Sequence, residues 1–184
     1  MAANFKVRIE NIVASATLGI EVPLDKLVSR LEGMEYEPEQ FPGLVYRMKE
    51  PKTAALIFSS GKIVCTGARN VKDVNLAFKK IASTLRRAGI KVPTKFKTQI
   101  ENIVASAKLN ARLNLDKIAL NLENTEYEPE QFPGLVYRMD EPKVAFLFFS
   151  SGKIVCTGAR NVKDVHKAIE LAYKKLQKIK AIIK

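Results

Sequence analysis

The sequence is poor in the residue types from which most catalytic and metal sites are built. It has one histidine and two cysteines among 184 residues, and no apolar run approaches the roughly 18 residues of a membrane-spanning helix. Two cysteines cannot complete a zinc site without other ligands, and no carboxylate pair or nucleophile–base pair stands out. We therefore expect a protein that is not an enzyme, holds no metal or cofactor and does not enter a membrane.

Acidic residues are also scarce, because 31 Lys and Arg face 19 Asp and Glu, a formal net charge of +12. Residues 1–91 carry 15 basic and 9 acidic residues and residues 92–184 carry 16 and 10, so each half contributes +6. An evenly spread positive excess favours a polyanionic partner, nucleic acid before an anionic membrane. A solvated lysine-rich surface has the same composition, so charge alone leaves both interpretations open.

The cysteines and the N-terminus indicate a compartment. Cys65 and Cys156 each follow Ile-Val in a short apolar segment, which is typical of buried free thiols in a reducing environment. The chain begins Met-Ala-Ala-Asn without a signal-peptide pattern. We expect an intracellular, cytoplasmic protein.

A long internal repeat organises the chain. The segments 35–48 and 58–74 return letter for letter 91 positions later, as 126–139 and 149–165. Two copies of this length are too few and too long for a solenoid. We interpret the chain as a duplication with a pseudo-two-fold axis and place the repeats at 1–91 and 92–184.

Each repeat is predicted to contain a strand, a short helix, four strands and a long helix. In the first repeat the expected elements are a strand from Phe5, a helix from Pro23 to about Glu32, strands at 36–40, 44–48, 53–58 and 62–67, and a helix from Asn70 to Gly89. Phe41-Pro42-Gly43 is predicted to form a tight reversal, and Asn70 with Asp73 has capping-box spacing. In the second repeat we expect the short helix at about 115–123 and the last helix from Asn161 to Lys184. The fold class is α+β, with one antiparallel sheet of about ten strands and helices on one face.

Strand alternation gives the two faces of this sheet different compositions. Ile12, Ala14, Ala55, Ile57, Ile63 and Cys65 form the face that the helices cover. The opposite face is apolar at its middle, basic toward its edges and, by this pattern, almost free of carboxylates. Contiguous exposed apolar surface usually marks a binding site, so this face is the candidate site.

Two phenylalanines in each repeat lead to the most specific hypothesis about binding. Phe41 and Phe58, and likewise Phe132 and Phe149, are 17 positions apart at a turn and at a strand end. Core packing explains a lone phenylalanine, but pairs at turn tips beside basic residues fit wedges inserted between base steps. Ser59-Ser60-Gly61-Lys62 lacks phosphate-loop spacing and precedes a strand, so we interpret it as a hairpin turn. His166 has Asn75 at its counterpart position and is interpreted as a surface residue.

The chain resembles the core of the TATA-binding protein family, and its archaeal members most. The resemblance rests on Tyr-Glu-Pro-Glu-Gln-Phe-Pro-Gly-Leu-Val-Tyr-Arg-Met and Phe-Ser-Ser-Gly-Lys-Ile-Val-Cys-Thr-Gly-Ala, both present twice, and it covers essentially the whole chain. It implies a saddle-shaped sheet with helices on the convex face, which sits on a widened minor groove and kinks the DNA at two steps. Double-stranded TATA-box DNA is then the partner, with transcription factor B and, indirectly, RNA polymerase. The implied location is the nucleoid of an archaeal cell.

The resemblance also assigns roles to residues. The implied DNA-intercalating wedges are Phe41, Phe58, Phe132 and Phe149. The implied minor-groove residues are Asn11, Val13, Leu56, Val64, Thr66, Asn102, Val104, Leu147, Val155 and Thr157. The residues at or beside phosphate contacts are Arg47, Lys52, Ser60, Lys62, Arg138, Lys143, Ser151 and Lys153. The residues that face transcription factor B are Glu128, Glu130 and Gln131.

Two further expectations concern assembly. The apolar face predicts weak self-association in the absence of DNA, because desolvating valine and phenylalanine is favourable. The identical halves predict that the protein alone reads a TATA-like box in both directions. The alternative from another class is a duplicated, non-enzymatic protein-interaction scaffold that uses the same apolar face.

Overall fold

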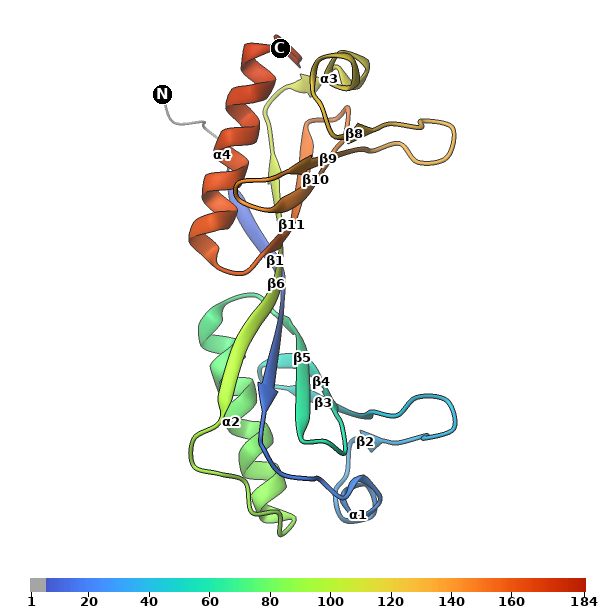
Figure 1. The fold of residues 1–184 in the computed structure, drawn as a ribbon, viewed down its shortest axis with the longest axis vertical. Coiled ribbons are helices and arrows are strands. Elements are labelled where there is room, and N and C mark those ends of the chain that lie inside the picture. Colours follow the sequence, from blue (N-terminus) through green and yellow to red (C-terminus); the bar gives the residue numbers. More distant parts are fainter. Residues whose placement is uncertain (1–5) are drawn as a thin grey trace. The chain divides into compact units, whose positions relative to one another are not determined.

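The computed structural model describes residues 6–184 and has an α+β fold (Figure 1). In the first repeat the elements are β1 (Val7–Thr17), α1 (Leu24–Arg30), β2 (Met34–Glu35), β3 (Leu44–Lys49), β4 (Lys52–Ile57), β5 (Lys62–Ala68) and α2 (Val71–Arg87). In the second they are β6 (Lys97–Lys108), β7 (Arg112–Leu113), α3 (Leu115–Asn121), β8 (Thr125–Glu126), β9 (Leu135–Met139), β10 (Val144–Phe148), β11 (Lys153–Ala159), α4 (Val162–Lys178) and β12 (Ile182–Ile183). The predicted order is confirmed for the first repeat, although its second strand lies at Met34–Glu35, and the second repeat adds β7 and β12 to that order.

Ten strands form one antiparallel sheet in the order β2-β3-β4-β5-β1-β6-β11-β10-β9-β8, and β12 pairs with β7 in a second sheet. The chain divides into two compact units. The N-unit is residues 11–101, and the C-unit is residues 102–184 with the described residues up to Glu10. Each unit therefore holds most of one repeat together with the first residues of the other.

The helix-covered face of each unit is apolar, as alternation predicts. Ile12, Ala55 and Ile57 are fully buried, and Ala14, Ile63 and Cys65 are 1% exposed. α2 packs on β5 through a stripe that includes Val74, Phe78, Ile81 and Leu85. Val71 does not belong to this stripe, because it begins the helix and is 41% exposed. The Asn70 cap is confirmed, since its side-chain Oδ1 accepts from the Asp73 amide at 2.8 Å.

The segment 36–40, predicted as a strand, is not one. β2 has only two residues, and the chain then leaves the sheet as a long loop to β3. The amides of Gln40 and Phe41 both donate to the Glu37 carbonyl oxygen at 2.9 Å, so the reversal lies at 37–41 and not at Phe41-Pro42-Gly43. Pro38 has no amide hydrogen for a strand ladder and favours this turn. The second repeat has the same loop, with Gln131 and Phe132 donating to Glu128.

The last helix ends earlier than predicted. α4 stops at Lys178, Lys180 takes a positive φ of 58°, and the Ala181 amide donates to the Leu176 carbonyl oxygen at 3.0 Å. This is the Schellman closure that α2 makes with Gly89, whose φ is 92°. The sequence obscured the stop because a lysine stands at the glycine position. The chain beyond it pairs as β12 with β7, which the repeat pattern did not predict.

Within residues 6–184 no helix combines the length and the apolar character needed to span a bilayer. Phe5, where the first strand was predicted to start, lies outside the described residues.

Candidate nucleic-acid interface

Each unit presents a strand face opposite its helix, which we call the open face. In the N-unit it carries Asn11, Val13, Val45, Arg47, Leu56, Val64 and Thr66, and in the C-unit their counterparts 91 positions on. The register confirms the grouping, because Leu56 pairs with Val64 and Leu147 with Val155. The valines and leucines of both floors, Val104 included, are half-buried although no helix covers them. Such a floor fits an apolar ligand surface better than water.

An asparagine is fixed at the centre of each open face. The Asn11 Oδ1 accepts from the Gly67 amide at 2.7 Å, and its Nδ2 donates to the Thr66 hydroxyl oxygen at 3.1 Å. The positive φ of Gly67, 105°, belongs to the bulge at which the β1–β5 register shifts. Asn102, Thr157 and Gly158 repeat the arrangement at 2.6 and 3.1 Å. The Nδ2 amino group has two N–H donors and uses one for the threonine, so each asparagine has a second N–H available to a ligand.

The phenylalanine pairs are confirmed as neighbours. The ring centroids of Phe41 and Phe58 are 5.9 Å apart at 67°, and those of Phe132 and Phe149 are 6.0 Å apart at 69°, both edge-to-face. Phe41 is 41% exposed and Phe132 is 45% exposed, while their partners are half-buried. Each pair therefore presents one anchored and one projecting ring at the base of the loop after β2 or β8.

Each open face carries a carboxylate, and the expectation of a face almost free of them is wrong. Arg47 Nη1 lies 3.0 Å from Glu35 Oε1, and Arg138 Nη1 lies 3.0 Å from Glu126 Oε1. Glu35 is opposite Val45 in the register, which places it on the open face. The sequence pattern does not place these glutamates on the open face, because β2 and β8 have only two residues each and show no alternation. Both arginines are therefore exposed to solvent as members of an ion pair with a glutamate.

The other basic and hydroxyl residues predicted at the rim are exposed in both units. They are Lys52, Ser60 and Lys62 in the N-unit and Lys143, Ser151 and Lys153 in the C-unit. The Ser60 hydroxyl accepts from the Lys62 amide at 3.4 Å, and Ser151 and Lys153 do the same, which confirms the hairpin turn. The turn leaves both ammonium groups free to reach an anion.

The two open faces are not wholly identical. Thr17 pairs with Lys62 in the N-unit, whereas its counterpart Lys108 pairs with Lys153 in the C-unit. The Lys108 ammonium contacts the Ser151 backbone oxygen. This difference was missed, although alternation along the strand from Asn11 could have found it. It adds one positive charge to the rim of the C-unit.

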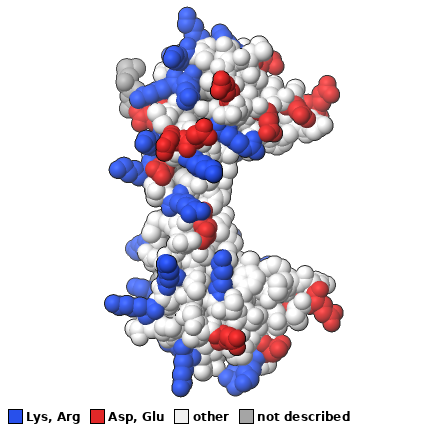
Figure 2. Space-filling view, viewed as in Figure 1, with Lys and Arg blue, Asp and Glu red and all other residues white. Residues whose placement is uncertain are grey.

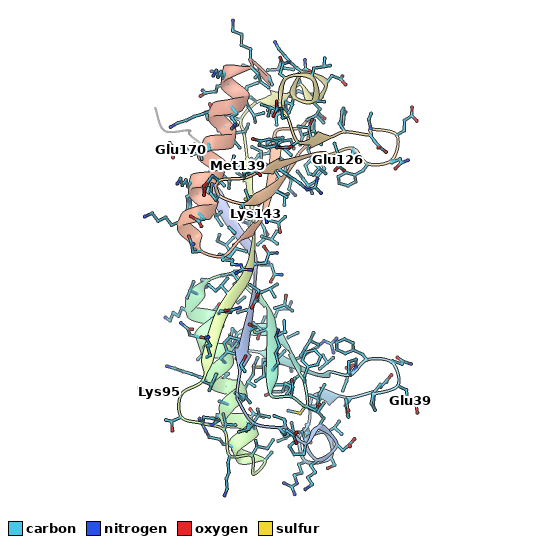
Figure 3. All side chains as sticks on the ribbon, in the orientation of Figure 1. Glu39, Lys95, Glu126, Met139, Lys143 and Glu170 are labelled. Carbon is cyan, nitrogen blue, oxygen red and sulfur yellow. The ribbon has the colours of Figure 1, made fainter. Side chains whose placement is uncertain are left out.

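The loops after β2 and β8 project from their units with acidic tips, as Figure 2 shows. Glu39 marks the tip of the first loop in Figure 3. In the second loop Glu128, Glu130 and Gln131 are all exposed. The carboxylates of Glu128 and Glu130 form no ion pair with any residue in the range 6–184.

The two cysteines lie on the buried face and take no part in this surface. Burial raises the pKa of the Cys156 thiol to about 12. Burial also raises the pKa of Cys65, and a hydrogen bond with Thr53 opposes part of that rise. Both are free thiols, and neither is a nucleophile at neutral pH.

Two α+β repeats, each with an apolar and basic strand face and a projecting aromatic pair, define a duplicated protein whose candidate ligand site is a sheet face. The family model described as "Transcription factor TFIID (or TATA-binding protein, TBP)" matches residues 6–88 and 97–179. The chain belongs to this family.

Similar proteins include the TATA-box-binding protein of Methanobrevibacter smithii, 53% identical over 96% of this chain and 97% of that one. The TATA-box-binding protein of Thermoplasma acidophilum is 52% identical over 97% and 98%. The solved structure of Methanococcus jannaschii TBP superposes with a TM-score of 0.85 at 50% identity and covers 95% of this chain and 98% of that one. The predicted family and fold class are thus confirmed, and the relatives are archaeal.

Proposed function

We propose that this protein binds A·T-rich promoter DNA of the TATA-box type through the minor groove and bends it, as a general transcription initiation factor. The observation that carries the proposal is the fixed asparagine beside a half-buried valine floor in each repeat. A·T pairs present only acceptors in the minor groove, whereas G·C pairs add the guanine amino donor. The available N–H of Asn11 or Asn102 suits an acceptor. The valines offer the guanine donor no partner, so a G·C pair there leaves a buried polar group unsatisfied.

The phenylalanine pairs supply the bend in this proposal. Phe41 and Phe132 are the exposed rings that would enter a base step, and Phe58 and Phe149 pack against them from the strand end. Unstacking a step costs a few kcal/mol, which is recovered when the bent duplex contacts more protein surface. Edge-to-face packing orients each projecting ring in the free protein, so that less ordering is needed when DNA binds.

Energy transfer between dyes at the two ends of an A·T-rich duplex tests the bending. Replacing Phe132 and Phe149 with alanine should reduce the bend while the dependence of affinity on salt persists, since charge and wedge act separately. The matched variant in the other repeat, Phe41→Ala with Phe58→Ala, should show a similar loss. Bending at the wild-type level in both double variants would exclude the wedge role. Equal affinity for A·T-rich and G·C-rich duplexes would instead favour the scaffold alternative.

We further propose that the second loop recruits transcription factor B and, through it, RNA polymerase. The support is the set of exposed carboxylates at Glu128 and Glu130 beside Gln131, which suits a basic protein surface. Glu128→Lys with Glu130→Lys should abolish the ternary complex with transcription factor B in a gel shift and leave the binary DNA complex intact. The same changes at Glu37 and Glu39 are the control and should leave both complexes intact.

A further inference from the structure

The C-unit holds a pocket of about 490 Å³ whose lining differs from the same place in the N-unit. It lies among the end of α3, the turn between β9 and β10, and α4, beside the turn that Met139 and Lys143 flank in Figure 3. Five of its eleven lining residues differ from their counterparts 91 positions earlier. They are Asn121, Asn124, Asp140, Leu171 and Lys175, which replace Arg30, Gly33, Lys49, Lys80 and Thr84. The pocket is therefore a feature of one repeat in a protein whose open faces are nearly the same.

One of these replacements removes a side chain that bridges to the long helix. In the N-unit, Arg30 Nη1 donates to the Ala88 carbonyl oxygen at the end of α2, at 2.8 Å. Its counterpart Asn121 is shorter and donates back within its own helix, to the Lys117 carbonyl oxygen at 2.8 Å. The space between α3 and α4 is left open as a result.

The charge at the pocket is reversed between the repeats. The lining carboxylates Glu123, Asp140 and Glu141 form no ion pair within residues 6–184. Of the lining cations, Arg138 is paired with Glu126, which leaves Lys175 on α4. The counterpart positions in the N-unit carry four cations and two carboxylates: Arg30, Arg47, Lys49, Lys80, Glu32 and Glu50. In Figure 2 acidic side chains gather beside α4 in the C-unit, over the turn between β9 and β10.

A tyrosine hydroxyl in the pocket lacks a partner. In the N-unit the Tyr46 hydroxyl lies 3.4 Å from the Thr84 hydroxyl oxygen. Its counterpart Tyr137 is 5% exposed, is stacked on Phe146 and Phe148, and lines the pocket. Lys175 replaces Thr84 at the counterpart position, and the Tyr137 hydroxyl has no hydrogen bond to any residue from 6 to 184. Among residues 6–184 no buried side-chain oxygen lacks a hydrogen-bond partner, so this unpartnered hydroxyl reaches solvent and is accessible to a ligand.

We propose that this pocket is a docking site for an arginine-bearing segment of a protein partner. A guanidinium has five N–H donors and no acceptor, which suits the oxygens of Tyr137, Asp140 and Glu141. The aliphatic stem of the arginine would lie against Leu122, Met139 and Leu171. The corresponding place in the N-unit is cationic and bridged by Arg30, so it rejects the same segment. Docking therefore distinguishes the C-unit from the N-unit. If the protein binds promoter DNA as proposed above, a partner docked at this pocket would give the complex one direction on the promoter.

The probe for the test is an acetylated and amidated pentapeptide, Gly-Leu-Arg-Leu-Gly, with glutamate replacing arginine in the matched peptide. Amide shifts in the ¹H–¹⁵N spectrum of the full chain should move at 121–124 and 137–141 with the arginine peptide and not with the glutamate peptide. Tyr137→Phe and Asp140→Asn should each weaken binding about tenfold, the value of one charge-assisted hydrogen bond. Lys49→Asn, the matched change in the other repeat, should leave peptide binding unchanged.

Binding of an A·T-rich duplex, measured on the same samples, separates this inference from the proposed function. Unchanged DNA binding with weakened peptide binding in Asp140→Asn is the expected result, and it also shows that the variant is folded. Equal responses to both peptides, or shifts at 30–33 and 46–50 instead, would overturn the docking site. Loss of DNA selectivity in the wild type with intact peptide binding would overturn the proposed function alone.

Discussion

Ser15 donates a hydrogen bond of 2.7 Å to the Glu101 carboxylate, across 86 positions of sequence. Ser106 donates to Glu10 at the same distance, so the relationship occurs once in each compact unit. Each unit therefore includes the opening strand residues of the other repeat. The boundary between compact units differs from the boundary between sequence repeats by ten residues.

Because each compact unit includes strand residues of the other repeat, we expect a fragment cut at the unit boundaries to be more stable than one cut at the repeat boundaries. A fragment of residues 11–101 keeps the Ser15–Glu101 bond, whereas a fragment of residues 1–91 loses it together with the neighbouring strand residues. We expect cooperative thermal unfolding, followed by circular dichroism, for 11–101 and a lower Tm for 1–91. A higher Tm for 1–91 would mean that the sequence repeat is the folding unit.

Removing the Arg138 side chain should lower the salt dependence of DNA binding. In the proposed complex Arg138 contacts one phosphate, so the slope of log affinity against log salt should fall by about 0.9 in Arg138→Ala. Glu126→Gln is the matched control, because it frees Arg138 without removing it and should not lower the slope. Fluorescence anisotropy at several salt concentrations measures both. An unchanged slope in Arg138→Ala would place this arginine away from the DNA.

The protein alone should bind a TATA-like box in both directions. The asparagines, valines, leucines, threonines and phenylalanines of the open faces are identical in the two repeats, and Lys108 against Thr17 adds a single charge. A tenfold preference needs about 1.4 kcal/mol, more than one exposed charge typically supplies. A cleavage reagent tethered to one repeat should cut at both ends of the box with comparable yield. A one-sided footprint without a partner would show that the small differences are sufficient.

Replacing Lys180 with glycine should stabilise the protein by about 0.5–1 kcal/mol. Its φ of 58° is strained for a residue with a side chain, while Gly89 takes a φ of 92° at the same closure of α2. Denaturant unfolding of Lys180→Gly measures the gain. The reverse change, Gly89→Lys, should destabilise by about 1 kcal/mol or more. A loss of stability in Lys180→Gly would show that the lysine side chain contributes more than its backbone costs.

The cysteines should make stability fall at alkaline pH. The pKa of Cys156 is about 12 in the folded protein, against about 8.5 for an exposed thiol. The contribution of the buried neutral thiol to the free energy of unfolding is fully present below about pH 8.5. It is lost as pH rises toward the folded pKa, by about 1.4 kcal/mol per pH unit. Chemical unfolding from pH 8 to 10 should show a steeper decline for the wild type than for Cys156→Ala. Rapid alkylation of the folded protein at pH 8 would contradict the burial.

The sequence by itself determined the duplication, the order of the elements that the two repeats share, the buried face and the pairing of Phe41 with Phe58. These follow from local rules, since strand alternation and an exact repeat carry the same information into each half. The family followed from motifs long enough to be specific. The lysine-closed end of α4 was missed because Schellman closure depends on backbone φ, and residue type does not fix it.

Only the tertiary structure decided which distant residues meet. Glu35 reaches Arg47, and Ser15 reaches Glu101, through strand pairing that no local pattern encodes. The pocket at Tyr137 exists because an arginine counterpart is an asparagine and three elements leave the space unfilled. A smaller residue leaves a pocket only when the neighbouring side chains do not fill the space that it vacates. That is a property of the neighbours and not of the substituted residue.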